Sequence, residues 1–166
     1  MIFEDNHLKL VENDNQLLVT VQPSDYDRKS QEFIKEYVKA QVSLTENGEL
    51  VLAYELPAFS ESLATCIAKA TTDLERYSLA QKVATLTVKP NDFNVVYLLP
   101  QNIYVSGNDV RLIHYGVSHI LAPQVFNQER YLKVYKALVA SILLPKVDFE
   151  LAIKGLDAVR EKKKKK

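Results

Sequence analysis

Few side chains in this sequence have the type and spacing that chemistry requires. None of the three histidines lies at a metal-ligand spacing from another histidine or from the single cysteine, Cys66. His114 could serve as a metal ligand or a base, but the lack of a second ligand favours a structural role. Asn102 could contact a divalent cation, although asparagine side chains more often cap loop backbone. We find no Ser-His-Asp arrangement and no nucleophile elbow.

The glycines are too sparse to bind phosphate. The chain has four, at positions 48, 107, 116 and 155, and no two are close enough to form a phosphate-cradling loop. This spacing excludes a Walker loop, a dinucleotide-binding fingerprint and a kinase glycine-rich loop. We therefore expect no cofactor and no metal ion.

Composition narrows the class of protein further. The 166 residues fit one domain, and 47% of them are hydrophobic, which is enough for a core. The 21 basic and 21 acidic residues balance, which argues against a nucleic-acid binder. One cysteine excludes an internal disulfide and fits a reducing compartment. Neither a secretory signal nor an apolar run long enough to cross a bilayer is evident.

The N-terminal third predicts strands and one helix. Alternating apolar residues predict strands within residues 2–22, with a turn at residues 12–15. A helix is predicted over about 27–42, because Phe33, Ile34, Tyr37 and Val38 recur at helical spacing. Residues 42–56 predict a hairpin that turns at Asn47-Gly48, since both residue types tolerate positive φ.

The remainder is predicted to be mainly helical. We expect helices over about 60–70 and 72–86, the second with a capping box formed by Thr72 and Glu75. A loop at residues 89–92, a buried extended run over 94–99 and a hairpin over 103–113 follow. Residues 117–127 are expected to be irregular. Helices are then predicted over about 128–144, with Tyr131, Val134, Tyr135, Leu138 and Ile142 on one face, and from about 148 onward. The order predicts an α+β protein with strands and helices segregated.

Residues 98–117, LLPQNIYVSGNDVRLIHYGV, resemble the catalytic and metal-binding stretch of protein kinases. Pro100 to Val105 matches the Pro-x-Asn-Ile-Leu-Val run after the kinase catalytic loop. His114, Tyr115 and Gly116 stand where that family has Asp-Phe-Gly. The order of predicted elements is also that of a kinase, which implies a protein-kinase-like fold.

This resemblance implies that the charged kinase residues are lost. Gln22 stands in place of the phosphate-binding lysine, Tyr97 in place of the catalytic aspartate, and His114 in place of the metal-binding aspartate. Only Asn102 keeps its metal-binding type. Phosphoryl transfer depends on charge neutralisation by magnesium and lysine, and magnesium prefers carboxylate and phosphate ligands. The resemblance therefore implies a pseudokinase and not an enzyme.

The second half of the chain is similar to a narrower family, EssB/YukC. The similarity lies in Asn102, HYGV, LAP, the helix ERYLKVYKALVASILL and FELAIKG, in that order. These proteins are membrane-anchored components of type VII (WXG100) secretion systems in Gram-positive bacteria. The resemblance implies one kinase-like domain over residues 1–161, with an N-lobe of about 1–56 and a C-lobe of about 57–161.

The family resemblance also implies partners and a location. The expected partners are other type VII secretion subunits, including the membrane ATPase, together with a second copy of the chain. In the family a transmembrane helix follows this domain, at the cytoplasmic face of the plasma membrane, and this sequence does not contain it. Lys162, Lys163, Lys164, Lys165 and Lys166 would then form a membrane-proximal basic tail. Composition alone predicts only a solvated tail.

Three functions therefore remain open. The first is a non-catalytic protein–protein interaction scaffold in a secretion machinery. The second is a divergent nucleotide-binding or kinase-like enzyme that uses Asn102 and an acid, for which Asp92 and Asp109 are the nearest candidates. The third is a peripheral membrane-binding domain driven by the lysine tail.

Overall fold

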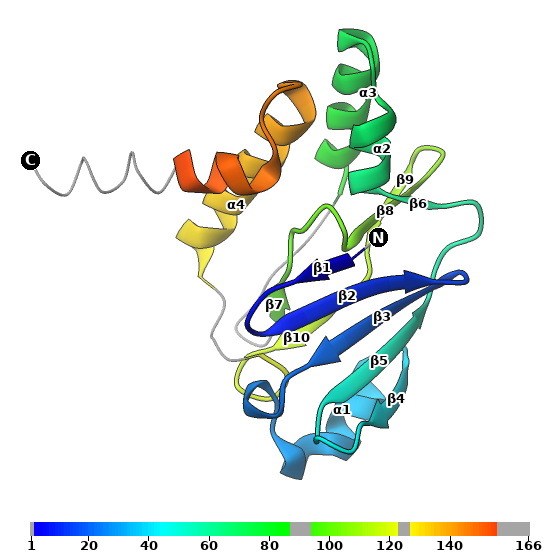
Figure 1. The fold of residues 1–166 in the computed structure, drawn as a ribbon, viewed down its shortest axis with the longest axis vertical. Coiled ribbons are helices and arrows are strands. Elements are labelled where there is room, and N and C mark those ends of the chain that lie inside the picture. Colours follow the sequence, from blue (N-terminus) through cyan, green and yellow to red (C-terminus); the bar gives the residue numbers. More distant parts are fainter. Residues whose placement is uncertain (1, 87–93, 123–126, 156–166) are drawn as a thin grey trace, which may run out of the picture.

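A computed structural model describes residues 2–86, 94–122 and 127–155 of the chain. Within these residues the architecture is mixed α+β (Figure 1). One antiparallel sheet dominates the N-terminal part, and the longer helices lie in the remainder, beyond one end of that sheet. This agrees with the predicted segregation of strands and helices.

The N-terminal sheet has five antiparallel strands in the order β1-β2-β3-β5-β4. Their bounds are β1 (Ile2–Glu4), β2 (Leu8–Asn13), β3 (Gln16–Val21), β4 (Gln41–Leu44) and β5 (Leu50–Glu55). The sheet buries every second residue of its central strands, including Leu8, Leu10, Leu17, Val19 and Val21. This alternation confirms the predicted strands, because successive side chains of a strand point to opposite faces.

The β2–β3 and β4–β5 hairpins of this sheet use different turns. Asn13 pairs with Gln16, and the two residues between them, Asp14 and Asn15, both have positive φ. This turn matches the twist of the flanking strands. The β4–β5 hairpin is confirmed, but its turn is not the two-residue Asn47-Gly48 turn predicted. Thr45 and Glu49 continue the backbone pairing, so the loop spans residues 46–48, and within it only Gly48 has positive φ.

The first helix is shorter than predicted. Short 3-10 turns over Pro23–Asp25 and Arg28–Ser30 lead into α1 (Gln31–Tyr37). The helix ends where Val38 becomes extended, so it does not reach residue 42. Its predicted apolar stripe is also only half buried. Ile34 and Val38 pack in the core, whereas Phe33 and Tyr37 form a second row that is 47% and 36% exposed.

The remaining elements contain more strand pairing than predicted. They are β6 (Glu61–Ser62), α2 (Leu63–Lys69), α3 (Asp73–Ala84), β7 (Asn94–Val96), β8 (Ile103–Ser106), β9 (Asp109–Leu112), β10 (Tyr115–Val117), α4 (Gln128–Leu143) and a helical stretch over residues 149–155. The predicted β8–β9 hairpin is present. Two further pairings, β6 with β8 and β7 with β10, join segments too distant for local sequence patterns to connect. The loop predicted at residues 89–92 lies outside the described residues.

Polar side chains cap the N-termini of α2, α3 and α4, and the cap of α3 was predicted from the sequence. The Thr72 hydroxyl accepts a hydrogen bond from the backbone N–H of Glu75 at 3.1 Å. It also donates to the Glu75 carboxylate, so these two residues form the predicted capping interaction. Ser62 and Asn127 cap α2 and α4 in the same way. Each such cap is typically worth about 1 kcal/mol. Among the described residues, no helix has the length and apolar content needed to span a membrane.

Two clusters of buried apolar residues stabilise the fold. The N-terminal core lies between the sheet and α1, and it also takes in Tyr104, Val117 and Leu121. The C-terminal core joins α2, α3, β8, β9 and α4. On α4, Leu138 and Ile142 are buried, with the three other residues of the predicted face packed beside them. The division into lobes at about residue 56 stays a prediction.

Candidate functional site

A polar cluster lies where the two cores meet. The chain between Asn102 and His114 contacts both cores. The C-terminal core includes Ile103 and Leu112, and the N-terminal core contacts Tyr104 and Ile113. The cluster brings together three residues that the kinase resemblance singled out and one that it did not. Its members are Tyr54, Tyr97, Asn102 and His114.

Asn102 uses its side chain to fasten two backbone segments together. Its amide nitrogen donates to the carbonyl oxygens of Tyr97 at 2.9 Å and His114 at 3.0 Å. Its amide oxygen accepts from the backbone N–H of His114 at 2.9 Å. Asn102 is fully buried, so these bonds are shielded from water. This arrangement fits the backbone-capping role considered from the sequence.

His114 is also fully buried, between two tyrosine rings. Its Nδ1 lies 2.7 Å from the hydroxyl of Tyr54, while the ring of Tyr97 stacks on it with centroids 5.3 Å apart. Its Nε2 is buried and has no hydrogen-bond partner among the described residues. Burial disfavours the charged ring and lowers the pKa of His114 to about 3. The imidazole is therefore neutral at physiological pH.

Tyr97, which the kinase resemblance puts in place of the catalytic aspartate, is a partly buried phenol. Burial is the main cause that raises its pKa, and the nearby carboxylates of Asp25 and Asp5 add to the effect. A phenol that stays protonated at neutral pH cannot replace a carboxylate as a proton acceptor. Its ring instead packs against His114, so this residue fills space at the junction of the cores.

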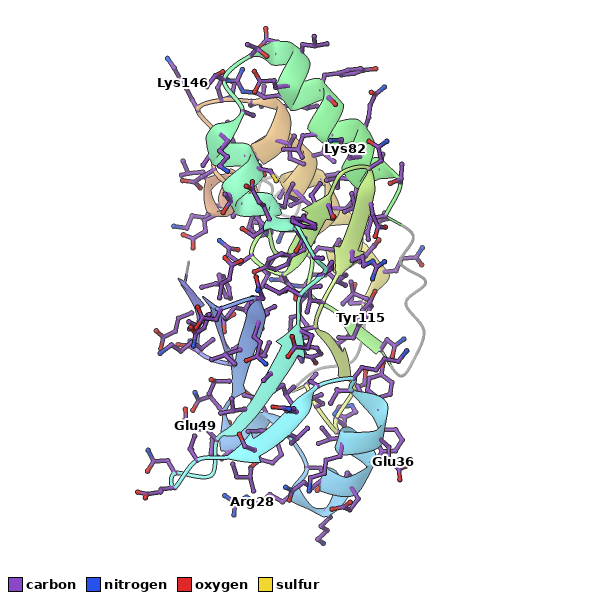
Figure 2. The ribbon with its side chains drawn as sticks, turned by 90° about the vertical axis from the view of Figure 1, so that its right-hand side faces the viewer. Arg28, Glu36, Glu49, Lys82, Tyr115 and Lys146 are labelled. Carbon is purple, nitrogen blue, oxygen red and sulfur yellow. The ribbon has the colours of Figure 1, made fainter. Side chains whose placement is uncertain are left out.

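Gln22 is not brought into this cluster. It lies between β3 and the first 3-10 turn, and its side-chain amide donates to the carboxylate of Glu49 at 3.2 Å. Figure 2 shows Glu49 and Tyr115 on opposite sides of the molecule. Gln22, which the kinase resemblance puts in place of the phosphate-binding lysine, therefore bonds to the β4–β5 hairpin.

Tyr115 and Gly116 form part of β10, which pairs with β7. Tyr115 is half-buried, and burial raises the pKa of its phenol. A Cβ at Gly116 would lie 2.9 Å from the Leu121 carbonyl oxygen, 3.1 Å from the Ala122 Cβ and 3.2 Å from the Val95 Cβ. These neighbours lie so close that a larger side chain would clash with them, which explains why position 116 is a glycine.

The acids proposed for an enzyme do not join the cluster in the described structure. Asp109 is exposed at the end of the β8–β9 hairpin and forms an ion pair with Arg111 at 2.8 Å. Asp92 and Lys162 to Lys166 lie outside the described residues. In the described ranges, no group of three or more histidine, cysteine or acidic residues could hold a metal ion.

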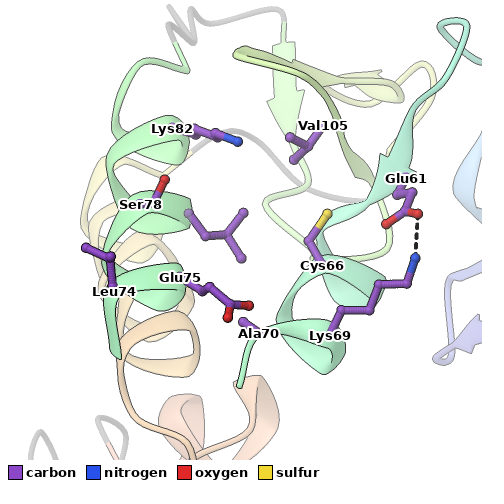
Figure 3. A pocket seen from close by; sticks show the side chains of 10 residues that line it. Glu61, Cys66, Lys69, Ala70, Leu74, Glu75, Ser78, Lys82 and Val105 are labelled. Carbon is purple, nitrogen blue, oxygen red and sulfur yellow. Dashed lines mark hydrogen bonds and ion pairs between the residues drawn. The ribbon is translucent and has the colours of Figure 1, made fainter. Parts of the chain in front are cut away.

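Cys66, the single cysteine, is half-buried. It faces a pocket of about 460 Å³ between α2 and α3 (Figure 3). Cys66 and Lys82 project into this pocket, and an ion pair between Lys69 and Glu61, at 2.6 Å, lies at its rim. Burial and the charge of Glu61 raise the pKa of the Cys66 thiol, so the reactive thiolate is disfavoured.

Tyr54 is the member of the polar cluster that the sequence analysis missed as a site residue. It follows Leu50 and Leu52 on the buried face of β5, and is itself 6% exposed. A signal was present, because this alternation predicts a buried phenol and buried hydroxyls usually have a hydrogen-bond partner. The identity of the partner, sixty positions later, could not be read from local patterns.

Comparison with known proteins identifies the family. A family model described as "WXG100 protein secretion system (Wss), protein YukC" matches residues 27–166. The chain belongs to the YukC family. The predicted EssB/YukC relationship is thereby confirmed, and with it the link to type VII secretion.

Relatives of this YukC-family chain support the assignment. An uncharacterised protein of Clostridium acetobutylicum is 37% identical over 129 residues, which cover 78% of the chain and 35% of that protein. The chain therefore matches about a third of the length of this relative.

Two solved structures share the fold. The EssB cytoplasmic fragment of Geobacillus thermodenitrificans aligns with a TM-score of 0.60 at 23% identity, over 89% of this chain and 74% of the fragment. The EssB cytoplasmic fragment of Staphylococcus aureus aligns with a TM-score of 0.55 at 15% identity, over 83% of this chain and 81% of the fragment. At such identities, the likeness describes the fold alone.

Proposed function

We propose that this chain is a non-catalytic structural domain of a WXG100 secretion machinery, with a kinase-like fold, that binds other subunits. Family membership supports the secretion context. The polar cluster carries the non-catalytic part of the proposal. Its side chains bond and stack with one another, and they include the residues that the kinase resemblance assigns to magnesium binding and proton transfer.

The energetic argument rests on Asn102 and His114. Binding magnesium through the Asn102 amide oxygen would compete with the hydrogen bond that this oxygen accepts from the His114 N–H. Turning the side chain towards an ion would also break the two bonds that its nitrogen donates. Each polar group left buried without a partner costs about 1–3 kcal/mol. Neutral His114 offers no carboxylate in return, so the ion would gain little for this cost.

We further propose where the domain works. Its partners are other secretion subunits, including the membrane ATPase, and a second copy of the chain. The full-length protein would be held at the cytoplasmic face of the plasma membrane by a transmembrane helix, with Lys162 to Lys166 close to anionic headgroups. The family relationship supports this placement.

Calorimetric titration with Mg-ATP tests the non-catalytic proposal. We expect no saturable binding up to about millimolar nucleotide, and no change in the melting temperature. A ligand at 100 times its dissociation constant would stabilise the folded state by about 2.7 kcal/mol, which is readily detected. Magnesium-dependent binding in the micromolar range would instead favour the kinase-like enzyme.

Capture by purified secretion subunits tests the scaffold role. The chain is immobilised through either end and offered the membrane ATPase, each other subunit and a second copy of itself. At least one is expected to bind, with the heat-unfolded chain as the control. Failure of all of them to bind, including when the chain is tethered to a vesicle, would contradict the scaffold function.

Vesicle flotation separates the scaffold from a peripheral membrane-binding domain. We expect weak, salt-sensitive binding to anionic vesicles that is lost when residues 162–166 are removed. Tight binding that is lost with residues 162–166 would favour the membrane-binding domain driven by the lysine tail. Binding that survives both salt and truncation would contradict a purely electrostatic tail.

A further inference from the structure

A pocket lined by three tyrosines opens beside α1. It has a volume of about 320 Å³ and lies between the end of α1, β5 and the start of β10. In Figure 2, α1, marked by Glu36, lies directly below Tyr115 on one side of the molecule. We call this pocket the tyrosine pocket. Its lining residues are Tyr37, Val38, Lys39, Tyr54, Ile113 and Tyr115.

The walls of the tyrosine pocket suit a planar apolar group. Two phenol hydroxyls are engaged elsewhere, that of Tyr37 with Asn94 and that of Tyr54 with His114. Aromatic rings pack favourably against other rings in stacked or edge-to-face arrangements. The volume lies at the lower end of the range for ligand sites, which fits one large side chain better than a nucleotide.

The positive charge beside the tyrosine pocket favours a ligand with a negative charge. Lys39 is exposed and forms no ion pair or hydrogen bond with any residue in the described ranges. None of the lining residues is acidic. Burial raises the pKa values of Tyr37 and Tyr115, so both phenols stay neutral and do not repel an anion. A cationic group would meet Lys39 without a compensating carboxylate.

The aromatic surface continues outside the tyrosine pocket. Phe33 stacks on Tyr37 with ring centroids 6.0 Å apart, and both side chains are exposed. Exposed aromatic residues around a pocket are typical of protein interfaces, where a few anchoring side chains contribute most of the binding energy. A ligand that covers this ridge as well as the pocket must be larger than a single small molecule.

We propose that the tyrosine pocket binds an aromatic side chain from a partner protein segment, and that a neighbouring carboxylate of that segment pairs with Lys39. This inference rests on the proposed partner-binding function, and it adds the surface and the chemistry of the partner. The aromatic group fills the pocket, the rest of the segment covers Phe33 and Tyr37, and the charge fixes the direction of the segment.

The absence of tryptophan from the chain allows a direct binding measurement. The probe is N-acetyl-Asp-Trp-Asp-amide, whose indole alone is excited at long wavelength. We expect saturable quenching or a blue shift of its emission as protein is added. The matched probe N-acetyl-Lys-Trp-Lys-amide should bind at least about 10-fold more weakly, because it brings a second cation to Lys39. Equal binding of the two probes, or binding of neither, would overturn the proposal.

Charge reversal locates the binding surface. Lys39→Glu should weaken binding of the acidic probe by about 10-fold or more and strengthen binding of the basic probe. Lys39→Arg should retain the preference for the acidic probe. Lys29→Glu, which changes another exposed lysine, is the matched control and should leave both affinities unchanged. Equal effects of Lys29→Glu and Lys39→Glu would show a general charge effect and would overturn the assignment to this pocket.

Two further measurements separate the possible failures. If indole-3-acetate alone binds as tightly as the acidic peptide, the tyrosine pocket is a small-molecule site and the proposed protein segment is wrong. If Lys39→Glu and Tyr37→Ala still capture secretion subunits as the unmodified chain does, the scaffold function stands and this pocket is not its docking surface. Loss of capture in both variants, with unchanged thermal stability, supports the proposal.

Discussion

The polar cluster and the tyrosine pocket share Tyr54, but they use their polar groups in opposite ways. In the cluster, Asn102 is buried and the hydrogen bonds of its side chain connect parts of this chain to one another. In the pocket, Lys39 faces solvent and lacks an ion-pair partner among the described residues. A polar group satisfied internally stabilises the fold, whereas one held at an open aromatic surface can bind a ligand.

The largest effect that this comparison predicts is that of Asn102→Ala. The substitution leaves the buried N–H and carbonyl of His114 without their side-chain partner. The Tyr97 carbonyl also loses a hydrogen bond but keeps the one from the Leu99 N–H. We expect a loss of about 3–5 kcal/mol in the free energy of unfolding, measured by urea denaturation. Asn47→Ala, in the exposed β4–β5 loop, should change it by less than about 0.5 kcal/mol. A loss below about 1 kcal/mol at Asn102 would show that the cluster is not a structural clamp.

Acid should weaken the fold through His114. Burial lowers its pKa to about 3 from the ordinary value of 6.5, so the unfolded state binds more protons between these values. Stability is therefore lost as the pH falls from about 6.5 towards 3, by at most about 1.4 kcal/mol per pH unit from this group.

Two variants isolate this contribution to the pH dependence. His114→Gln should flatten the dependence of unfolding free energy on pH in this window. His119→Asn, at an exposed position with positive φ that asparagine tolerates, should leave the slope unchanged. Identical slopes for His114→Gln and the unmodified chain would mean that His114 is not buried as described.

Gly116→Ala should produce a smaller loss by steric crowding. The new methyl group would meet the Leu121 carbonyl oxygen at 2.9 Å, so β10 must shift away from its neighbours. We expect a loss of about 1–3 kcal/mol in thermal or urea unfolding. Gly155→Ala, where no atom lies within 4 Å of the added group, should be neutral or stabilising by up to about 1 kcal/mol. The same outcome at both positions would contradict the tight packing around β10.

The smallest expected effect on stability is that of Lys39→Glu. An exposed side chain outside the cores should change the free energy of unfolding by no more than about 0.5 kcal/mol. Together with the loss of probe binding, this result would show that Lys39 contributes to binding and not to stability, the opposite of Asn102. A large destabilisation would instead show that Lys39 takes part in the fold.

Local patterns predicted the elements of this fold well. Alternating residues such as Leu17 and Val19 indicated the strands, and Thr72 with Glu75 indicated a helix start, because both signals depend on near neighbours in sequence. The end of α1 was placed too late because its apolar spacing continued past Tyr37 while the backbone of Val38 had already become extended. The β7–β10 pairing was missed because nothing in either short segment specifies its partner.

The site was predicted in residue type but not in geometry. The kinase resemblance selected Tyr97, Asn102 and His114, and the structure brings them together. It did not predict that Asn102 would bond to backbone atoms, because their position depends on the folded β8–β9 hairpin. The tyrosine pocket was not anticipated at all, since its walls come from three segments separated along the chain.

The bond between Tyr54 and His114 also has a consequence for how the chain is made. The two residues are separated by 60 positions. At a synthesis rate of about 5–20 residues per second, Tyr54 is complete roughly 3–12 s before its partner exists. During that interval the strands of the N-terminal sheet can already pair while their core lacks Tyr104 and Val117. Nascent chains stalled before and after residue 114 should therefore differ in their resistance to protease.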